Sequence, residues 1–196
     1  MTDQTDLAAL LGSRICHDLI SPIGAIGNGV ELLMMEGGTP SPELVLIAES
    51  VAAANARIRF FRLAFGVSGS EQRLGRAEIA KVLADTCQGS RITIDWHPKD
   101  PIPRAQAKLA FLAILACESA LAYGGRITVS LTDGKWQVHA HATRLRIAPG
   151  LWGSLSNPAA LLPPAQVHFA LFSREIRQQS RRLMTEIGET DITLSF

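Results

Sequence analysis

The spacing of apolar residues in the first third of the chain predicts a long helix. From Leu19 to Leu33, apolar residues recur at positions 19, 23, 26, 30 and 33, at alternating steps of four and three. This spacing places them in one continuous stripe along a helix. We expect the helix to span about residues 6–36 and to end at the glycine pair that follows.

Capping signals in the segment "TPSPE" predict a second helix. Ser41 suits the N-cap, Pro42 the first helical position, and Glu43 the positive end of the helix dipole. Apolar residues at 44, 47, 51, 54, 58, 61 and 65 then form a heptad seam, and Gly66 is expected to end the helix. Two long helices joined by a short turn make a helical hairpin.

Each predicted helix carries an apolar seam, which a lone hairpin of this length buries only in part. A second copy of the chain can complete the core as a dimeric four-helix bundle, so we expect a homodimer. The alternative is that residues beyond 70 cover the hairpin.

The composition changes after Gly66, where a Gly- and Ser-rich stretch predicts a domain boundary. We expect a helical hairpin over residues 1–68 and a second domain over 69–196. In the second domain the pattern predicts a helix over 76–86, a strand in "RITIDWH", a buried helix in "PRAQAKLAFLAILACESALAY", two strands around Asp133-Gly134, a helix from about Pro164 and two strands turning near Gly188. This order predicts an α+β sandwich, one sheet with helices on one face.

The composition, the net charge and the cysteines narrow the possible partners and the cellular location of the protein. The chain has 196 residues, 47% hydrophobic and 19% charged, with a formal charge of +1, so we expect a soluble globular protein that binds no nucleic acid. No apolar run approaches the roughly 20 residues of a membrane span, and the acidic N-terminus does not resemble a signal peptide. The three cysteines are far apart, which favours a reduced, cytoplasmic setting without a membrane contact.

The five histidines form no local metal-binding pattern, and we predict no metal site. His139 and His141 alternate within a predicted strand and therefore share one face of it. A metal site there is an open alternative, but a solvated strand face accounts for the pattern.

His17 is the candidate functional residue. At about 100° per residue it points roughly 200° away from the apolar Ile15 and Leu19. Ser13 and Ser21 stand four residues before and after it, so a small polar face surrounds a reachable ring.

The residues around His17 depart from ordinary helix composition. Pro22 removes the helical hydrogen bond to the Asp18 carbonyl and kinks a helix at a cost of about 3 kcal/mol. Glycines at 24, 27 and 29 each cost roughly 1 kcal/mol against alanine. Such departures mark functional sites.

An exposed imidazole beside a carboxylate can act as a nucleophile. Asp18 can bind one ring nitrogen and leave the other to attack, which would give a phosphohistidine, while Arg14 is spaced to pair with Asp18. The alternative of a hydrolase that uses Ser13 or Ser21 with His17 is disfavoured, because a continuous helix offers no oxyanion hole.

The motif "HDLISP" resembles the phosphoacceptor motif of two-component histidine kinases. With "ARIRFFRLAFG" at the end of the second helix and "YGGRITV" after the buried helix, the chain is most similar to the ChpT-type histidine phosphotransferases of alphaproteobacteria. That resemblance implies a dimeric hairpin bundle followed by a degenerate kinase ATPase domain that uses no ATP.

The sequence lacks the nucleotide-binding residues of a kinase. Leu115 and Ser119 stand where kinases carry asparagines, and neither a DxGxG box nor a GxxxxGK[ST] loop occurs. We therefore expect no bound cofactor.

By this resemblance, His17 accepts a phosphoryl group from the aspartyl phosphate of one response-regulator receiver domain, including that of a hybrid histidine kinase, and passes it to another. Asp18 orients the ring, Arg14 and Ser21 line the site, and the receiver supplies the Mg²⁺.

Ser13, Gly24 and Asn28 are expected to contact the partner. Two other functions remain open: a non-catalytic adaptor that binds receivers or a kinase, and an ATP-dependent kinase with a divergent nucleotide site.

Overall fold

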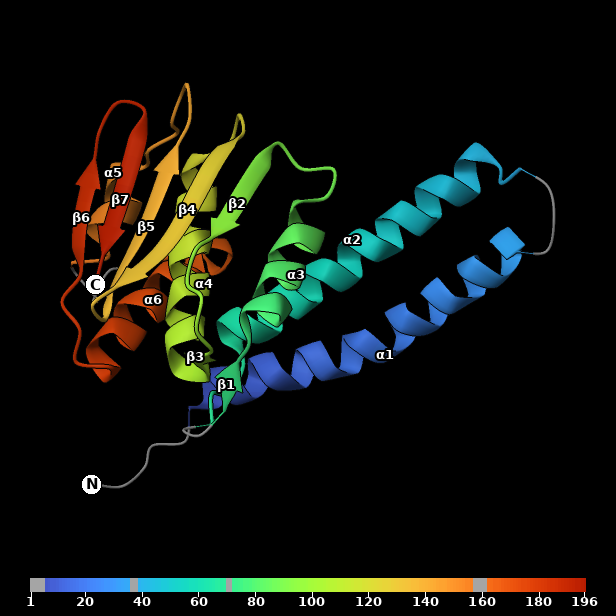
Figure 1. The fold of residues 1–196 in the computed structure, drawn as a ribbon, viewed down its shortest axis with the longest axis horizontal. Coiled ribbons are helices and arrows are strands. Elements are labelled where there is room, and N and C mark those ends of the chain that lie inside the picture. Colours follow the sequence, from blue (N-terminus) through green and yellow to red (C-terminus); the bar gives the residue numbers. More distant parts are fainter. Residues whose placement is uncertain (1–5, 36–38, 70–71, 157–161) are drawn as a thin grey trace. The chain divides into compact units, whose positions relative to one another are not determined.

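The computed structural model describes residues 6–35, 39–69, 72–156 and 162–196. The chain divides into two compact units, Met1–Ser68 and Gly69–Phe196. The first unit contains two helices, α1 (Leu7–Met35) and α2 (Pro42–Phe65), which run antiparallel side by side (Figure 1). The predicted helical hairpin is confirmed, while the expected stop at residues 37–38 lies outside the described residues.

Capping residues set the ends of α2 as predicted. The Ser41 hydroxyl accepts a hydrogen bond from the Leu44 N–H at 3.3 Å, and Pro42 is the first helical residue. Such a cap stabilises a helix by about 1 kcal/mol. At the other end, the N–H of Gly66 donates to the carbonyl of Arg62.

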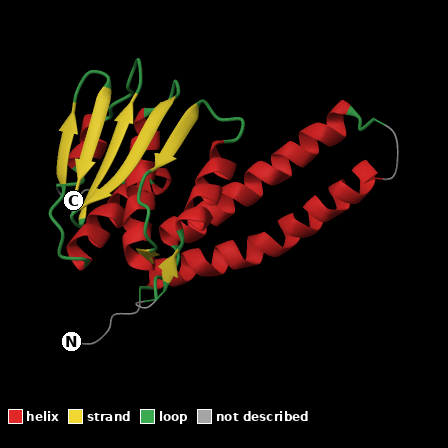
Figure 2. Ribbon diagram, in the orientation of Figure 1, coloured by secondary structure: helices red, strands yellow, loops and turns green. Residues whose placement is uncertain are grey.

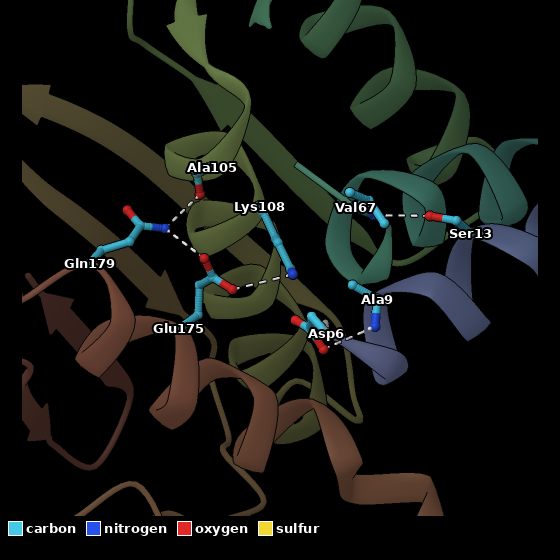
Figure 3. Close-up of polar contacts among 8 residues, drawn as sticks. All are labelled: Asp6, Ala9, Ser13, Val67, Ala105, Lys108, Glu175 and Gln179. Atoms are coloured by element: carbon cyan, nitrogen blue, oxygen red, sulfur yellow. Dashed lines mark hydrogen bonds and ion pairs between the residues drawn. The ribbon is translucent and has the colours of Figure 1, made fainter. Parts of the chain in front are cut away.

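The two helices approach closely where α1 begins and α2 ends. A Cβ on Gly12 would lie 3.1 Å from the Cβ of Phe65, so a larger residue would push the helices apart. The hydroxyl of Ser13 accepts a hydrogen bond from the Val67 N–H at 2.9 Å (Figure 3). This end of the hairpin is therefore fixed by both packing and a hydrogen bond.

The apolar residues of α1 form two faces, whereas the sequence predicted one stripe. Cys16 and Val30, two heptads apart, are buried. Leu19, Ile26 and Leu33 are instead 44%, 53% and 57% exposed. A single neighbouring helix covers only part of a helix surface, so α2 buries one face and leaves the other open.

The second unit contains the predicted α+β sandwich. Its central sheet has the strand order β2-β4-β5-β7-β6, with β2 and β4 parallel and the other neighbours antiparallel. A two-stranded sheet of β1 and β3, and the short helix α5, were not predicted. The elements are β1 (Arg73–Leu74), α3 (Arg76–Cys87), β2 (Ile92–Trp96), β3 (Ile102–Pro103), α4 (Arg104–Ala120), β4 (Gly125–Thr132), β5 (Lys135–His141), α5 (Pro149–Gly153), the 3₁₀ turn η1 (Pro164–Gln166), α6 (Val167–Gln178), β6 (Met184–Ile187) and β7 (Asp191–Ser195).

Apolar side chains at alternate positions of the strands build the core of this unit, and helices cover one face of the sheet (Figure 2). Ile127 and Val129 of β4 and Val138 of β5 are fully buried, as is most of α4. The β4–β5 turn has positive φ at Asp133 (51°) and Gly134 (77°), as its Asp-Gly sequence predicts.

A buried ion pair joins α4 to α6. Lys108 Nζ lies 3.2 Å from Glu175 Oε2, and the two side chains are 5% and 10% exposed. The Gln179 amide donates both to Glu175 Oε1 at 2.9 Å and to the Ala105 carbonyl at 2.8 Å (Figure 3). Each oxygen of the buried carboxylate therefore has a partner.

Candidate functional site

His17 lies on an open flank of the helical hairpin. Cys16 is buried, so its two neighbours, Ile15 and His17, point to opposite flanks. The His17 side chain is 83% exposed, and Ile15 is 50% exposed on the other flank. The imidazole is therefore reachable by a second protein, as the sequence predicted.

Asp18 holds the His17 ring from one side. Its Oδ1 lies 3.2 Å from His17 Nδ1, and its Oδ2 accepts a hydrogen bond from Arg14 Nε at 2.7 Å. A carboxylate can only accept hydrogen bonds, so Nδ1 carries the proton, and in the neutral imidazole Nε2 then has the lone pair. The predicted Arg14–Asp18 pair is present, so the three side chains form one hydrogen-bonded chain on the exposed flank.

The charge state of Asp18 follows from these two contacts. The hydrogen bond with His17, and then the hydrogen bond and positive charge of Arg14, hold the pKa of the Asp18 carboxyl below its usual value. Asp18 is therefore ionised at neutral pH.

The other predicted site residues follow His17 along the same flank, with one exception. Ser21 is exposed one turn further, and Asn28 is exposed beyond it. A Cβ on Gly24 would meet no atom within 4 Å, so that position has space for a docking partner. Ser13 is the exception, because its hydroxyl binds the Val67 N–H within the hairpin.

In the second unit, Leu115 and Ser119 stand at the positions where kinases carry the asparagines of the nucleotide site. Leu115 is 5% exposed, and Ser119 Oγ donates to the Ala116 carbonyl at 2.6 Å. Ser119 also lines a cavity of about 200 Å³ with Arg146 and Trp152. Within the described ranges, no three His, Cys, Asp or Glu side chains are grouped as a metal would require, and no helix is long and apolar enough to cross a membrane.

The sequence predicted no role for Arg62 of α2. Arg62 lies close enough to Cys16 for its positive charge to act on the thiol. The antiparallel register of the two helices, which meet at Gly12 and Phe65, could have indicated this proximity. Cys16 lies about one turn after Gly12, and Arg62 lies about one turn before Phe65.

Comparisons with known proteins show the family of this chain. Residues 76–191 match the family described as histidine phosphotransferase C-terminal domain. The protein phosphotransferase ChpT of Brucella abortus (strain 2308) is 35% identical over 169 residues, covering 83% of this chain and 80% of that protein. A structure described as a bacterial phosphotransferase at 1.7 Å covers 100% of this chain and 97% of its own, with a TM-score of 0.69 and 27% identity.

A helical hairpin followed by an α+β sandwich, together with these matches, identifies the chain as a phosphotransferase of the two-component type. The chain belongs to the ChpT-type histidine phosphotransferases. It is a protein phosphotransferase that acts through histidine in a phosphorelay, as the sequence predicted.

Proposed function

We propose that His17 is the phosphoacceptor of this phosphotransferase. The contact between His17 Nδ1 and Asp18 Oδ1, at 3.2 Å on an exposed flank, is the observation that carries the proposal. It leaves Nε2 as the nucleophile and provides a negative charge beside the ring. Both are needed when the ring becomes positively charged on attack.

The proposed reaction moves one phosphoryl group, and one bond to phosphorus forms while another breaks. The Nε2 lone pair attacks the phosphorus of an aspartyl phosphate, the N–P bond forms, and the P–O bond to the aspartate breaks. The leaving carboxylate keeps the electron pair. The proton on Nδ1 stays hydrogen-bonded to Asp18, which offsets the ring charge until a second aspartate takes the phosphoryl group.

The donor and acceptor in this proposal are receiver domains of response regulators, one of them in a hybrid histidine kinase. The receiver supplies the Mg²⁺, and the phosphorelay step consumes no ATP. Leu115 and Ser119, at the positions of the kinase asparagines, support this by offering no amide oxygen for a nucleotide-bound metal.

We further propose that the chain is a homodimer through the outer apolar face of α1. We define this face as Leu11, Ile15, Leu19, Ile26 and Leu33, which are between 44% and 61% exposed. Their spacing follows one flank of the helix, opposite to that of His17. A second copy packed there would bury this face and leave both histidines accessible.

The small residues that follow His17 support receiver docking on its flank. Gly24 has open space where a side chain would stand, and Ser21 and Asn28 are exposed beside it. A partner helix can approach the backbone closely over a glycine.

A transfer assay without ATP tests the proposed site. A receiver domain is phosphorylated with acetyl phosphate, freed of the donor, and mixed with this protein and Mg²⁺. We expect the phosphoryl group to appear on the wild type and not on His17→Gln. His141→Gln, which changes an exposed strand histidine, should be phosphorylated like the wild type.

Two results would count against the proposal. Labelling of His17→Gln would place the phosphoacceptor elsewhere. A wild type that takes no label from several receivers, yet still binds them, would favour the adaptor alternative.

A further inference from the structure

We propose that Arg62 of α2 is an electrostatic positioning residue of the phosphotransfer site, whose positive charge draws the incoming phosphoryl group to His17. This inference rests on the proposed role of His17. It gives a function to the "ARIRFFRLAFG" segment, which the reaction as described above does not use.

The register of the hairpin brings Arg62 to the level of the histidine. Gly12 packs on Phe65 at one level, and further along Gly27 would place a Cβ 3.3 Å from Val51. Because the helices are antiparallel, moving one turn up α1 from Gly12 and one turn back along α2 from Phe65 brings Cys16 opposite Arg62. His17 is the residue that follows Cys16.

The Cys16 thiol reports the positive charge of Arg62. Burial raises the pKa of this thiol, and the guanidinium of Arg62 acts in the opposite direction. A charge that affects a thiol between the helices also acts on an anion at the adjacent residue, since Coulomb interactions decline only gradually with distance.

The charges already at the site make a further cation useful. Asp18 and Arg14 form an ion pair at 2.7 Å and largely cancel each other. A phosphoryl group brings about two negative charges. An additional positive charge therefore favours both the approach of the group and its retention on the ring.

Another arginine of the same segment has a different environment. The guanidinium of Arg57 stacks over the rings of Phe60 and Phe61, with centroid distances of 5.1 and 4.8 Å. Five residues separate it from Arg62, which places the two about 140° apart around the helix. Arg57 therefore faces another flank, and the segment directs one arginine to aromatic packing and another to Cys16.

The test separates charge from packing at position 62. Arg62→Met keeps the aliphatic stem and removes the charge, whereas Arg62→Lys keeps the charge. Lys81→Met removes one charge from an exposed position in the other unit and serves as the control. With a phosphorylated receiver and Mg²⁺, we expect kcat/KM to fall about tenfold for Arg62→Met and to stay within about threefold for Arg62→Lys and Lys81→Met.

The dependence on salt provides a readout that a structural role would not change. Added KCl should slow the wild type and Arg62→Lys more than Arg62→Met, because less attraction remains to be screened. Wild-type rates for Arg62→Met would overturn the inference, as would equal losses for the Met and Lys variants. If Arg62→Met melts early, Arg62→Gln is compared with Arg62→Lys below both melting temperatures, and equal rates would again overturn it. Continued transfer by His17→Gln would instead contradict the proposed phosphoacceptor.

Discussion

Replacing Ile26 with glutamate should separate the proposed homodimer into monomers. Ile26 lies in the middle of the outer apolar face and is 53% exposed. In a four-helix bundle this surface would be covered by the second copy, so a charged side chain there would lose water without gaining a partner.

The size of the effect follows from the exposed fraction. Full burial of an isoleucine contributes about 1.5–3 kcal/mol, so the half still exposed is worth about 1 kcal/mol in each copy and about 2 kcal/mol in the dimer. That loss alone raises the dissociation constant about 30-fold, and desolvation of two carboxylates adds to it.

Sedimentation velocity over a range of concentrations measures this dissociation constant. Leu32→Glu is the matched control, because Leu32 is 62% exposed and lies about 120° around α1 from Ile26. We expect Ile26→Glu to be monomeric where the wild type and Leu32→Glu are dimeric. An unchanged dimer for Ile26→Glu, or equal weakening by both substitutions, would refute the assignment of the interface to the outer apolar face.

Three further substitutions test the site and the fold. Asp18→Asn should slow phosphoryl transfer about tenfold at all pH values above about 5, because the lowered pKa of Asp18 keeps the native carboxylate charged there. Equal rates for the variant and the wild type at pH 7 would contradict the orienting role of Asp18. Gly24→Leu should reduce transfer about tenfold without loss of helicity, and a fast Gly24→Leu would exclude docking there. Lys108→Met should lower the free energy of unfolding by about 3 kcal/mol in urea, since it removes the cation paired with a buried carboxylate, and the double variant with Glu175→Leu should recover most of it; no recovery would contradict the ion-pair explanation.

The helices and strands could largely be predicted because their signals are local. The cap at Ser41, the turn at Gly134 and the apolar run of α4 each specify structure within a few residues. The paired strands β1 and β3 have two residues each, and α5 has five, so neither offers enough length for a periodic pattern.

In the candidate site, contacts between residues close in sequence could be predicted, and contacts between the two helices could not. Arg14 and Asp18 lie one helical turn apart, so their contact follows from helix geometry, and His17 is the residue next to Asp18. The bond from Val67 to Ser13 joins residues 54 apart in sequence, and the proximity of Arg62 to Cys16 also depends on how the two helices pack. Likewise, periodicity identified the apolar residues of α1 but not which of them α2 would cover.

Mapping the transferred phosphoryl group tests the central claim most directly. The protein is incubated with a phosphorylated receiver and Mg²⁺ in the absence of ATP, digested at neutral to mildly alkaline pH, and its acid-labile phosphopeptides are sequenced by mass spectrometry. The account predicts one phosphorylated residue, His17, with the bond at Nε2 by NMR. Phosphate on another of the five histidines, or at Nδ1 of His17, would contradict it.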